Sequence, residues 1–312
     1  MTQIAVIQHA PVMLAREACI SKAIGLIAEV AAQGAQLVIF PEAFIGGYPA
    51  WIWRMRPGND WGSYEAIHAR MLDNAVEITR GDLQPLQDAA REHGVVVVCG
   101  MNERDTEFSR ATLYNSCVVI GDDGQLLNCH RKLMPTNPER MVWGFGDATG
   151  LRVIDTPLGR IGTLICWENY MPLARFALYA QGVDIYIAPT YDSGDDWQQS
   201  LQHIAREGGC WTISAGVQLN ASDMPEDLPN IDQLYPDKQE NINPGDSVIV
   251  APDGSTLAGP LHAQSGVLMA DIDVDQAARS RRTRDVAGHY ARPDIFTLQI
   301  NEQAQQPLRW VK

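Results

Sequence analysis

The chain repeats one unit several times: an amphipathic helix followed by a short run of apolar residues. In the first copy, five apolar residues lie at helical spacing, namely Ile20, Ala23, Ile24, Ile27 and Ala31. Gly34 ends this helix, and residues 36–40 (QLVIF) form the apolar run. A strand without polar alternation is typical of a sheet that is buried on both faces. The repeated unit therefore predicts an α/β protein.

The copies of this unit match one another in order along the chain. Predicted helices precede three further apolar runs, at residues 94–99, 183–188 and 210–217. Residues 34–42 (GAQLVIFPE) resemble residues 182–190 (GVDIYIAPT), and residues 90–100 resemble residues 205–216. This order predicts two similar halves related by a pseudo-two-fold axis, each a sheet with helices on one face, packed as a four-layer αββα sandwich. The alternative is that similar composition alone produces the likeness.

Chain length allows one large α/β domain or two small ones, since the 312 residues are 46% hydrophobic. No Pro/Ser-rich linker interrupts residues 1–295, so we predict a single domain there. Residues 296–312 carry four glutamines among other polar residues, and we expect them to form a C-terminal arm or tail.

Charge and cysteine usage narrow the class of protein. Lys and Arg number 24 against 38 Asp and Glu, and the net charge of −14 disfavours nucleic acid and anionic membranes as partners. No apolar stretch approaches the roughly 20 residues needed to span a bilayer, and no signal peptide is visible at the start. The six cysteines are scattered without a CxxC pair, which predicts a reduced, cytoplasmic protein.

Common metal and cofactor motifs are not found in the sequence. Residues 144–150 (GFGDATG) are one residue too long for a dinucleotide-binding GxGxxG turn, and GxSxG, Walker and HExxH patterns are missing. The seven histidines stand apart from one another and lack metal-ligand spacing. We therefore expect neither a metal nor an organic cofactor.

Three predicted strands end in a residue that could carry chemistry. Cys166 follows the predicted strand 160–165 and precedes a helix, whose N-terminus would lower the pKa of a thiol and make it a nucleophile. Glu42 follows the first apolar run and could act as a general base. Lys132 follows residues 126–131 and could stabilise developing negative charge. Each residue alone also has a plainer interpretation: a core cysteine, a solvated turn glutamate and a surface basic cluster.

Taken together, the segments around these residues resemble one family. They are residues 40–44 (FPEAF), 130–136 (HRKLMPT) and 165–169 (ICWEN), supported by residues 137–144 (NPERMVWG), 166–175 (CWENYMPLAR) and 288–294 (GHYARPD). In this order they resemble the carbon–nitrogen hydrolase superfamily and, within it, the nitrilase branch. The resemblance runs from about residue 3 to about residue 300, and it implies the αββα fold.

The resemblance also implies a role for each of four residues. Cys166 corresponds to the nucleophile, Glu42 to the general base, Lys132 to the cation beside the intermediate, and Glu139 to the second carboxylate of the family's tetrad. The implied reaction is hydrolysis of an organic nitrile to the carboxylic acid and ammonia, through a thioimidate and a thioester on Cys166. This chemistry requires no metal or organic cofactor.

Substrate specificity is predicted from residues near these segments. The expected substrate-binding residues are Tyr48, Trp53, Trp143, Trp167, Thr190 and Trp197. Aromatic side chains could line a pocket for an aromatic or arylaliphatic nitrile, and residues 166–197 most resemble nitrilases that act on such substrates. The alternative is that the tryptophans fill the core and a subunit interface.

Two other functions compete with the nitrilase. One is an amidase or carbamoylase of the same superfamily, against which the segments CWEN and PERMVWG count. The other is a non-catalytic member that binds small ligands or acts as a scaffold. Such a protein would have no reason to retain Glu42, Lys132, Glu139 and Cys166 together.

The resemblance further implies a homo-oligomer, a dimer or larger. Only 18 residues follow Asp294, fewer than nitrilases usually carry, so long filaments are not expected. One basic cluster interrupts the acidic chain, at Arg279, Arg281, Arg282 and Arg284. It is either a salt-bridged helix face or an electrostatic contact between subunits.

Overall fold

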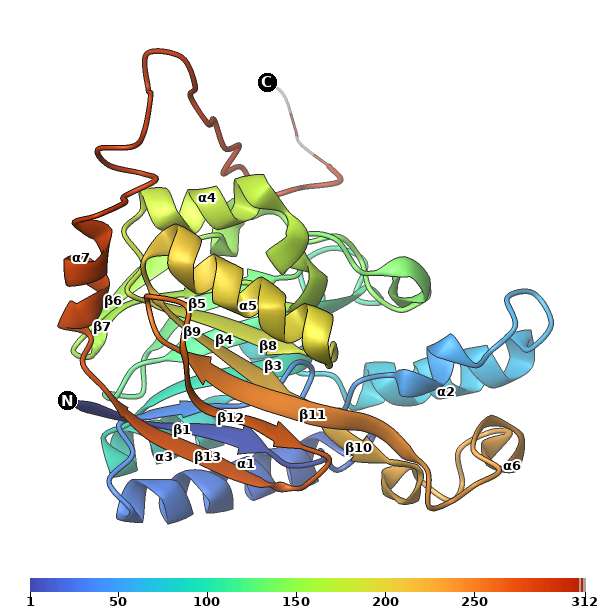
Figure 1. Ribbon diagram of the computed structural model, residues 1–312. Coiled ribbons are helices and arrows are strands. Elements are labelled where there is room, and N and C mark those ends of the chain that lie inside the picture. Colours follow the sequence, from blue (N-terminus) through green and yellow to red (C-terminus); the bar gives the residue numbers. More distant parts are fainter. Residues whose placement is uncertain (309, 311–312) are drawn as a thin grey trace.

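Two β-sheets face each other in the middle of the molecule, and helices cover their outer faces (Figure 1). The computed structural model describes residues 1–308 and 310. Its layers run helix, sheet, sheet, helix, which confirms the predicted αββα sandwich. Among the described residues, no helix is both long and apolar enough to cross a membrane.

The first sheet has the strand order β13-β1-β2-β3-β4-β5. Its strands are β1 (Thr2–Gln8), β2 (Leu37–Ile39), β3 (Val96–Arg104), β4 (Leu113–Ile120), β5 (Leu126–Arg131) and β13 (Gly266–Ile272). Helices α1 (Arg16–Ala32) and α3 (Gln84–His93) pack on its outer face. Both predicted helices are confirmed, and Gly34 and Gly94 follow them with positive φ angles of 100° and 61°.

The second sheet has the order β10-β11-β9-β8-β7-β6, with β12 paired to β11. Its strands are β6 (Val153–Thr156), β7 (Gly159–Thr163), β8 (Ile185–Thr190), β9 (Trp211–Gly216), β10 (Gln218–Asn220), β11 (Asn241–Val250) and β12 (Thr256–His262). Helices α4 (Pro172–Ala180) and α5 (Asp195–Gly208) cover it. Both helices lie where the sequence predicted them.

The two sheets repeat one topology. Strands β1, β2 and β3 run parallel, with β13 antiparallel on one side and β4 antiparallel on the other. Strands β7, β8 and β9 also run parallel, flanked in the same way by β6 and β11. The predicted internal repeat is therefore confirmed. Because β13 comes from the end of the second half, it also joins that half to the first sheet.

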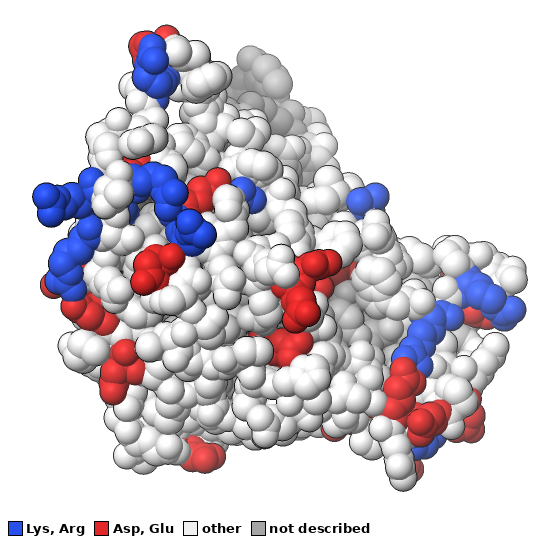
Figure 2. All heavy atoms as spheres, in the orientation of Figure 1, with Lys and Arg blue, Asp and Glu red and all other residues white. Residues whose placement is uncertain are grey.

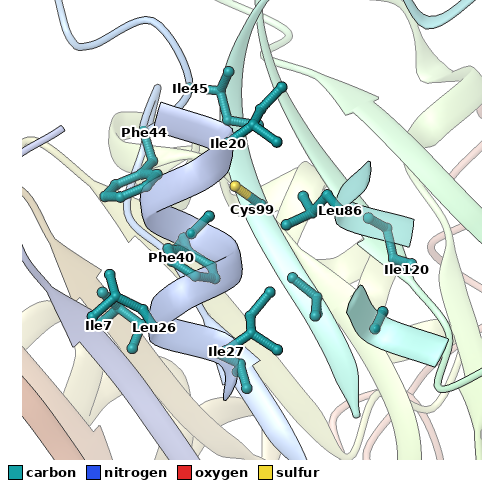
Figure 3. Close-up of a cluster of buried hydrophobic side chains, with 14 of the residues drawn as sticks. Ile7, Ile20, Leu26, Ile27, Phe40, Phe44, Ile45, Leu86, Cys99 and Ile120 are labelled. Carbon is teal, nitrogen blue, oxygen red and sulfur yellow. The ribbon is translucent and has the colours of Figure 1, made fainter. Parts of the chain in front are cut away.

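Strand β2 shows why the apolar runs lack polar alternation. Successive side chains of a strand point to opposite faces, and here both faces are covered. Phe40 packs under the helices (Figure 3). Val38 belongs to the same cluster, while Leu37 and Ile39 face the second sheet. Fully burying a side chain of this size contributes about 1.5–3 kcal/mol to folding. A polar residue at any of these positions would therefore lie in the core.

A smaller helical region projects from one end of the sandwich. Helices α2 (Trp61–Asp73) and α6 (Ile231–Leu234) extend to the same side in Figure 1. Arg54 links the segments that lead to them, because its guanidinium pairs with Glu240 and donates to the Leu234 carbonyl at 2.7 Å. Short 3₁₀ turns complete the chain, at Ala50–Trp53, Ile78–Arg80, Asn137–Met141, Ala148–Gly150, Cys166–Tyr170 and Ala221–Asp223.

The basic cluster lies on and after the last helix, α7 (Asp275–Arg281), and basic side chains gather over that region in Figure 2. Arg279 pairs with Asp273, and Arg281 contacts Asp184 at 3.1 Å. These two arginines are therefore salt-bridged within their own chain. Of the expected arm at residues 296–312, residues 309 and 311–312 lie outside the described part, and its described residues form no helix or strand.

Candidate active site

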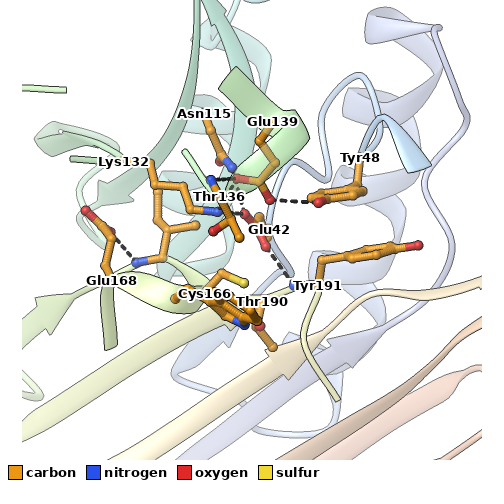
Figure 4. A network of polar contacts seen from close by, with 12 residues as sticks. Glu42, Tyr48, Asn115, Lys132, Thr136, Glu139, Cys166, Glu168, Thr190 and Tyr191 are labelled. Atoms are coloured by element: carbon orange, nitrogen blue, oxygen red, sulfur yellow. Dashed lines mark hydrogen bonds and ion pairs between the residues drawn. The ribbon is translucent and has the colours of Figure 1, made fainter. Parts of the chain in front are cut away.

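Cys166 begins the turn that follows β7. Its backbone has φ 52°, a left-handed conformation that side chains with a Cβ rarely adopt. The side chain is buried, and Figure 4 shows its sulfur beside Thr190 and on the side of Glu42 and Lys132. A sharp turn at the end of a strand can thus hold a thiol against groups delivered by the other sheet.

Glu42 lies just past β2, where Pro41 has no N–H to continue the strand pairing. One carboxylate oxygen accepts from Lys132 Nζ at 2.8 Å and from Asn115 Nδ2 at 2.7 Å. The other accepts from the backbone N–H of Tyr191 at 2.6 Å. Gly100 makes room for this turn, since a Cβ there would lie 2.3 Å from the Pro41 oxygen.

Lys132 follows β5, and its backbone N–H still pairs with the Asn115 carbonyl of β4 at 2.7 Å. Its side chain is fully buried, and Nζ lies 2.8 Å from both Glu42 Oε1 and Glu139 Oε2. The plainer expectation of a surface basic cluster is therefore wrong for Lys132. It is also wrong for His130, which is buried on the same side of the strand.

Glu139 is positioned by its own local sequence. Thr136 and Glu139 form a capping box, the Thr-x-x-Glu pattern that starts a helical turn, and Glu139 Oε2 accepts from the Thr136 N–H at 2.7 Å. The other oxygen accepts from the Tyr48 hydroxyl at 2.7 Å. The same carboxylate therefore caps a turn, holds Lys132 and orients an aromatic ring.

Burial and neighbouring charges together set the pKa values of Glu42 and Lys132. Burial raises the pKa of Glu42, and Glu139 adds to this while Lys132 opposes it. Burial alone would lower the pKa of Lys132, but Glu42, Cys166 and Glu139 outweigh it and leave that pKa raised. The site thus keeps an ammonium between two carboxylates in a dry environment.

The thiol differs from the sequence-based expectation. A helix N-terminus was expected to lower the pKa of Cys166, yet burial and the neighbouring Glu42 raise it, while Lys132 and the Thr190 hydroxyl act in the opposite direction. The expected effect of the helix N-terminus is missing because a short 3₁₀ turn, Cys166–Tyr170, separates Cys166 from α4. Proton transfer to a nearby base, rather than the helix dipole, must then generate the thiolate.

Three of the expected substrate-binding residues form an aromatic frame beside the carboxylates. The ring of Tyr48 stacks on the ring of Tyr191 at a centroid distance of 3.7 Å. The rings of Tyr48 and Trp143 meet in a T-shaped arrangement at a centroid distance of 5.7 Å. Trp53 is partly exposed and donates its indole N–H to the Tyr48 hydroxyl at 3.0 Å. Tyr48, Trp53 and Trp143 therefore lie together next to Glu139, and Tyr191 joins them although the sequence analysis did not select it.

The other expected substrate-binding residues have different surroundings. Trp167 follows Cys166, is 44% exposed and donates its indole N–H to Asp192 at 2.8 Å. Thr190 is buried beside Cys166. Trp197 is fully buried between α5 and the outer face of the second sheet, where it donates to the Ser214 hydroxyl at 3.0 Å. The structure does not bring Trp197 to the site, because its position on α5 points inward to the core.

Several residues of the site were missed by sequence reasoning. Asn115 and the Tyr191 N–H both hold Glu42, and Glu168, which lies in the same turn as Cys166, forms a buried pair with His130. A polar residue inside the apolar strand β4 was a usable signal for Asn115. The backbone contact of Tyr191 depends on the meeting of the two sheets and leaves no trace in the side-chain pattern.

The grouping of a thiol, an ammonium and two carboxylates can perform nucleophilic acyl-type chemistry. Among residues 1–308 and 310, no three or more His, Cys, Asp or Glu side chains are arranged to hold a metal ion. Cys166 offers a nucleophile, Glu42 a base and Lys132 a fixed positive charge.

Comparison with known proteins agrees with this arrangement. The family described as carbon–nitrogen hydrolase matches residues 3–282. The chain belongs to the carbon–nitrogen hydrolase family. Full-length relatives place it in the nitrilase branch of the family. It is 42% identical to an aliphatic nitrilase of Sinorhizobium fredii (strain HH103) over 300 residues, which cover 96% of this chain and 95% of the relative.

Plant relatives are similarly close. The chain is 40% identical to a bifunctional nitrilase/nitrile hydratase of Nicotiana tabacum, with 97% of this chain and 87% of the relative covered. It is also 40% identical to nitrilase 1 of Arabidopsis thaliana, covering 99% and 89%.

Solved structures of the family share the fold. A carbon–nitrogen hydrolase from Helicobacter pylori G27 superposes with a TM-score of 0.67 at 20% identity, covering 90% of this chain and 92% of that chain. The NitFhit protein of C. elegans gives a TM-score of 0.70 at 20% identity, covering 98% and 68%.

Proposed function

We propose that this protein hydrolyses an organic nitrile to the carboxylic acid and ammonia through covalent intermediates on Cys166. The observation that carries the proposal is the position of Lys132 Nζ, 2.8 Å from both Glu42 and Glu139 and on the side of the site that the Cys166 sulfur faces. The full-length likeness to nitrilases supports the same reaction.

In the first step, Cys166 sulfur attacks the nitrile carbon while Glu42 accepts the thiol proton. One carbon–nitrogen π bond breaks and its electron pair moves to nitrogen, which takes the thiol proton from Glu42, so that a thioimidate forms and Glu42 is ionised again. In this proposal the Lys132 ammonium and the backbone N–H of Trp167 stabilise the negative charge on nitrogen. Glu139 keeps Lys132 in place throughout.

In the second step, Glu42 removes a proton from a water molecule that adds to the thioimidate carbon. Both protons of this water reach the nitrogen, one through Glu42 and the other from the hydroxyl that becomes the carbonyl, and breaking the carbon–nitrogen bond then releases ammonia and leaves a thioester on Cys166. A second water hydrolyses this thioester, so the acid leaves and the thiol is restored. Glu42 thus works in each half of the reaction, which its raised pKa favours because a more basic carboxylate accepts protons more readily.

A second product is an amide. If the carbon–sulfur bond of the tetrahedral species breaks before the carbon–nitrogen bond, the amide leaves and no ammonia forms. Relatives named bifunctional nitrilase/nitrile hydratases, 40% identical to this chain, motivate this branch. Which bond breaks depends on which leaving group, the nitrogen or the Cys166 sulfur, holds the proton.

For the substrate, we propose an aromatic or arylaliphatic nitrile. Support comes from the frame of Tyr48, Trp53, Trp143 and Tyr191 next to the carboxylates, with Trp167 on the side of the nucleophile. Aromatic rings favour contact with another flat, apolar group. A relative named an aliphatic nitrilase makes an aliphatic substrate the competing possibility.

A panel of nitriles tests both levels of the proposal. Aliphatic, aromatic and arylaliphatic nitriles are each incubated with the protein, together with the corresponding amides, and ammonia, acid and amide are measured in parallel. Ammonia and acid from at least one nitrile are expected, with the highest kcat/KM for a substrate that carries a ring. Turnover of amides alone would replace the nitrilase with an amidase, and higher kcat/KM for aliphatic nitriles would reject the aromatic pocket.

We also propose that the protein is a homo-oligomer, a dimer or larger, and that residues 1–295 act as one domain. Sedimentation velocity measures the first directly. Changing Arg281 and Arg282 together to Glu would leave the sedimentation coefficient unchanged if the basic cluster lies outside the subunit contact.

A further inference from the structure

Glu168 lies two residues after Cys166 and is completely buried. One of its oxygens accepts from the Ile165 N–H at 2.6 Å, and the other accepts from the Leu133 N–H at 2.6 Å. His130 Nε2 lies 3.0 and 3.1 Å from the two oxygens. Because a carboxylate can only accept, this ring nitrogen carries the hydrogen and donates. Both oxygens of Glu168 are thus engaged.

These partners come from the two halves of the active site. His130 and Leu133 lie on either side of Lys132, at the end of β5 in the first sheet. Ile165 immediately precedes Cys166, at the end of β7 in the second sheet. A single carboxylate therefore joins the segment that carries the ammonium to the segment that carries the thiol.

The turn at Cys166 needs such support. Its φ of 52° is disfavoured for a residue with a side chain, and conformations of this kind persist where the surroundings fix the backbone. Glu168 holds the peptide N–H before Cys166, and Asn169 Nδ2 donates to the carbonyls of Cys166 at 2.7 Å and of Leu164 at 3.0 Å. The backbone is thus held on both sides of the nucleophile.

We propose that Glu168, oriented by His130, is a positioning residue that sets the separation of Lys132 and Cys166 during turnover. The proposal rests on the proposed function, since it assigns Lys132 and Cys166 their roles. Glu168 acts through its neighbours and contacts no substrate. Small errors in the placement of reacting groups can cost about 10²-fold in rate, so a loosened link should be visible in kcat.

The test compares Glu168→Gln with Glu103→Gln. The amide introduced by E168Q has one accepting end only, so it cannot accept from Ile165 and Leu133 together. Glu103 is the matched control, because it is also a buried carboxylate and binds Arg131, one residue before Lys132, from the other face of β5. We expect E168Q to lower kcat at least about 10-fold with KM within about 3-fold, and E103Q to keep kcat within about 2-fold.

A second pair of variants examines His130. His130→Gln retains an N–H donor near the position of Nε2, whereas His130→Leu removes it. We expect H130L to reproduce the loss in E168Q and H130Q to recover most of the activity. Equal losses in the two variants would reject the role given to His130. If E168Q does not fold, as judged by its thermal transition, the H130L and H130Q pair decides the proposal.

Alkylation gives a readout that is independent of nitrile turnover. Each variant is treated with iodoacetamide over a range of pH, and modification of Cys166 is followed by peptide mass spectrometry. E168Q and H130L should move the midpoint of the alkylation profile to higher pH, because the thiolate would lose its fixed cation, and E103Q should not. Wild-type kcat and an unmoved midpoint in E168Q would overturn the proposal. If the wild type hydrolyses no nitrile, the proposed function fails, while the alkylation profiles still decide whether Glu168 positions Cys166.

Discussion

The two halves of the molecule share one topology but contribute different chemistry. Glu42 lies five residues after the first residue of β2, and Thr190 lies five residues after the first residue of β8. Both strand ends reach the same site, one with a carboxylate that can take a proton and the other with a hydroxyl beside Cys166. The pseudo-symmetric fold therefore brings matching strand ends together, and the residue at each end determines its function.

The same contrast holds three strands further along each sheet. Lys132 follows β5 in the first half, is fully buried and contacts two carboxylates. His262 occupies the matching end of β12 in the second half, where its side chain is 69% exposed and meets Asp246 at 2.6 Å. In the proposed mechanism the first half thus supplies base and cation and the second supplies the nucleophile, so that neither half alone holds a complete site.

The largest effect is expected for the nucleophile of the second half. Cys166→Ala should lower ammonia release from a good nitrile by at least about 10³-fold, because no other group can form the covalent intermediate. Ammonia assays measure the loss, and a thermal denaturation curve close to that of the wild type shows that the fold is kept. Substantial residual turnover would exclude Cys166 as the nucleophile, and with it the proposal that the second half supplies the nucleophile.

Next come the acid–base residues of the first half. Glu42→Gln and Lys132→Met should each reduce kcat/KM by at least about 10²-fold. In the wild type, Glu42 must be ionised to accept a proton and its pKa is raised, so activity should fall on acidification at a pH above the usual glutamate value of about 4.3. A pH–rate profile locates this limb, and a rate near the wild-type value in either variant would exclude that residue.

A smaller effect is expected for the second-half counterpart of Glu42. Thr190→Val keeps the shape but removes the hydroxyl that lowers the pKa of Cys166, so thiolate formation should move to higher pH and kcat near neutral pH should fall about 10-fold. Thr190→Ser is the control, since it retains the hydroxyl. If the two variants have the same kcat and the same pH dependence, the Thr190 hydroxyl has no part in thiolate formation and Thr190 contributes only to packing.

The smallest effect on turnover is expected in the outer layer of the second half. Trp197→Phe removes a buried hydrogen bond to Ser214 and should lower the free energy of unfolding by about 2 kcal/mol. KM should stay at its wild-type value for every nitrile tested, because Trp197 lies under α5. A change in the order of preferred nitriles would show that Trp197 affects substrate binding after all.

Much of the fold was predictable from local patterns. The spacing of apolar residues along the chain was enough to predict the helix that contains Ile20 and the strand that leads to Phe40. The likeness of residues 34–42 to residues 182–190 revealed the repeat. Burial on both faces of β2 explains why that signal was clear. Cys166, Glu42 and Lys132 were recognisable because each stands at the end of such a run, and Glu139 because its segment resembled a family.

The sequence by itself determined the order of the elements and the chemical types at the strand ends. Only the tertiary structure decided that Lys132 is buried between two carboxylates, that Tyr191 supplies a backbone N–H to Glu42, and that Glu168 bridges the segments that carry Lys132 and Cys166. It also placed Trp197 in the core and raised the pKa of Cys166. The physical reason is that these properties depend on solvent exclusion and on tertiary contacts, such as those of Glu42 with Lys132 and with Tyr191, which join residues 90 and 149 positions apart in the chain.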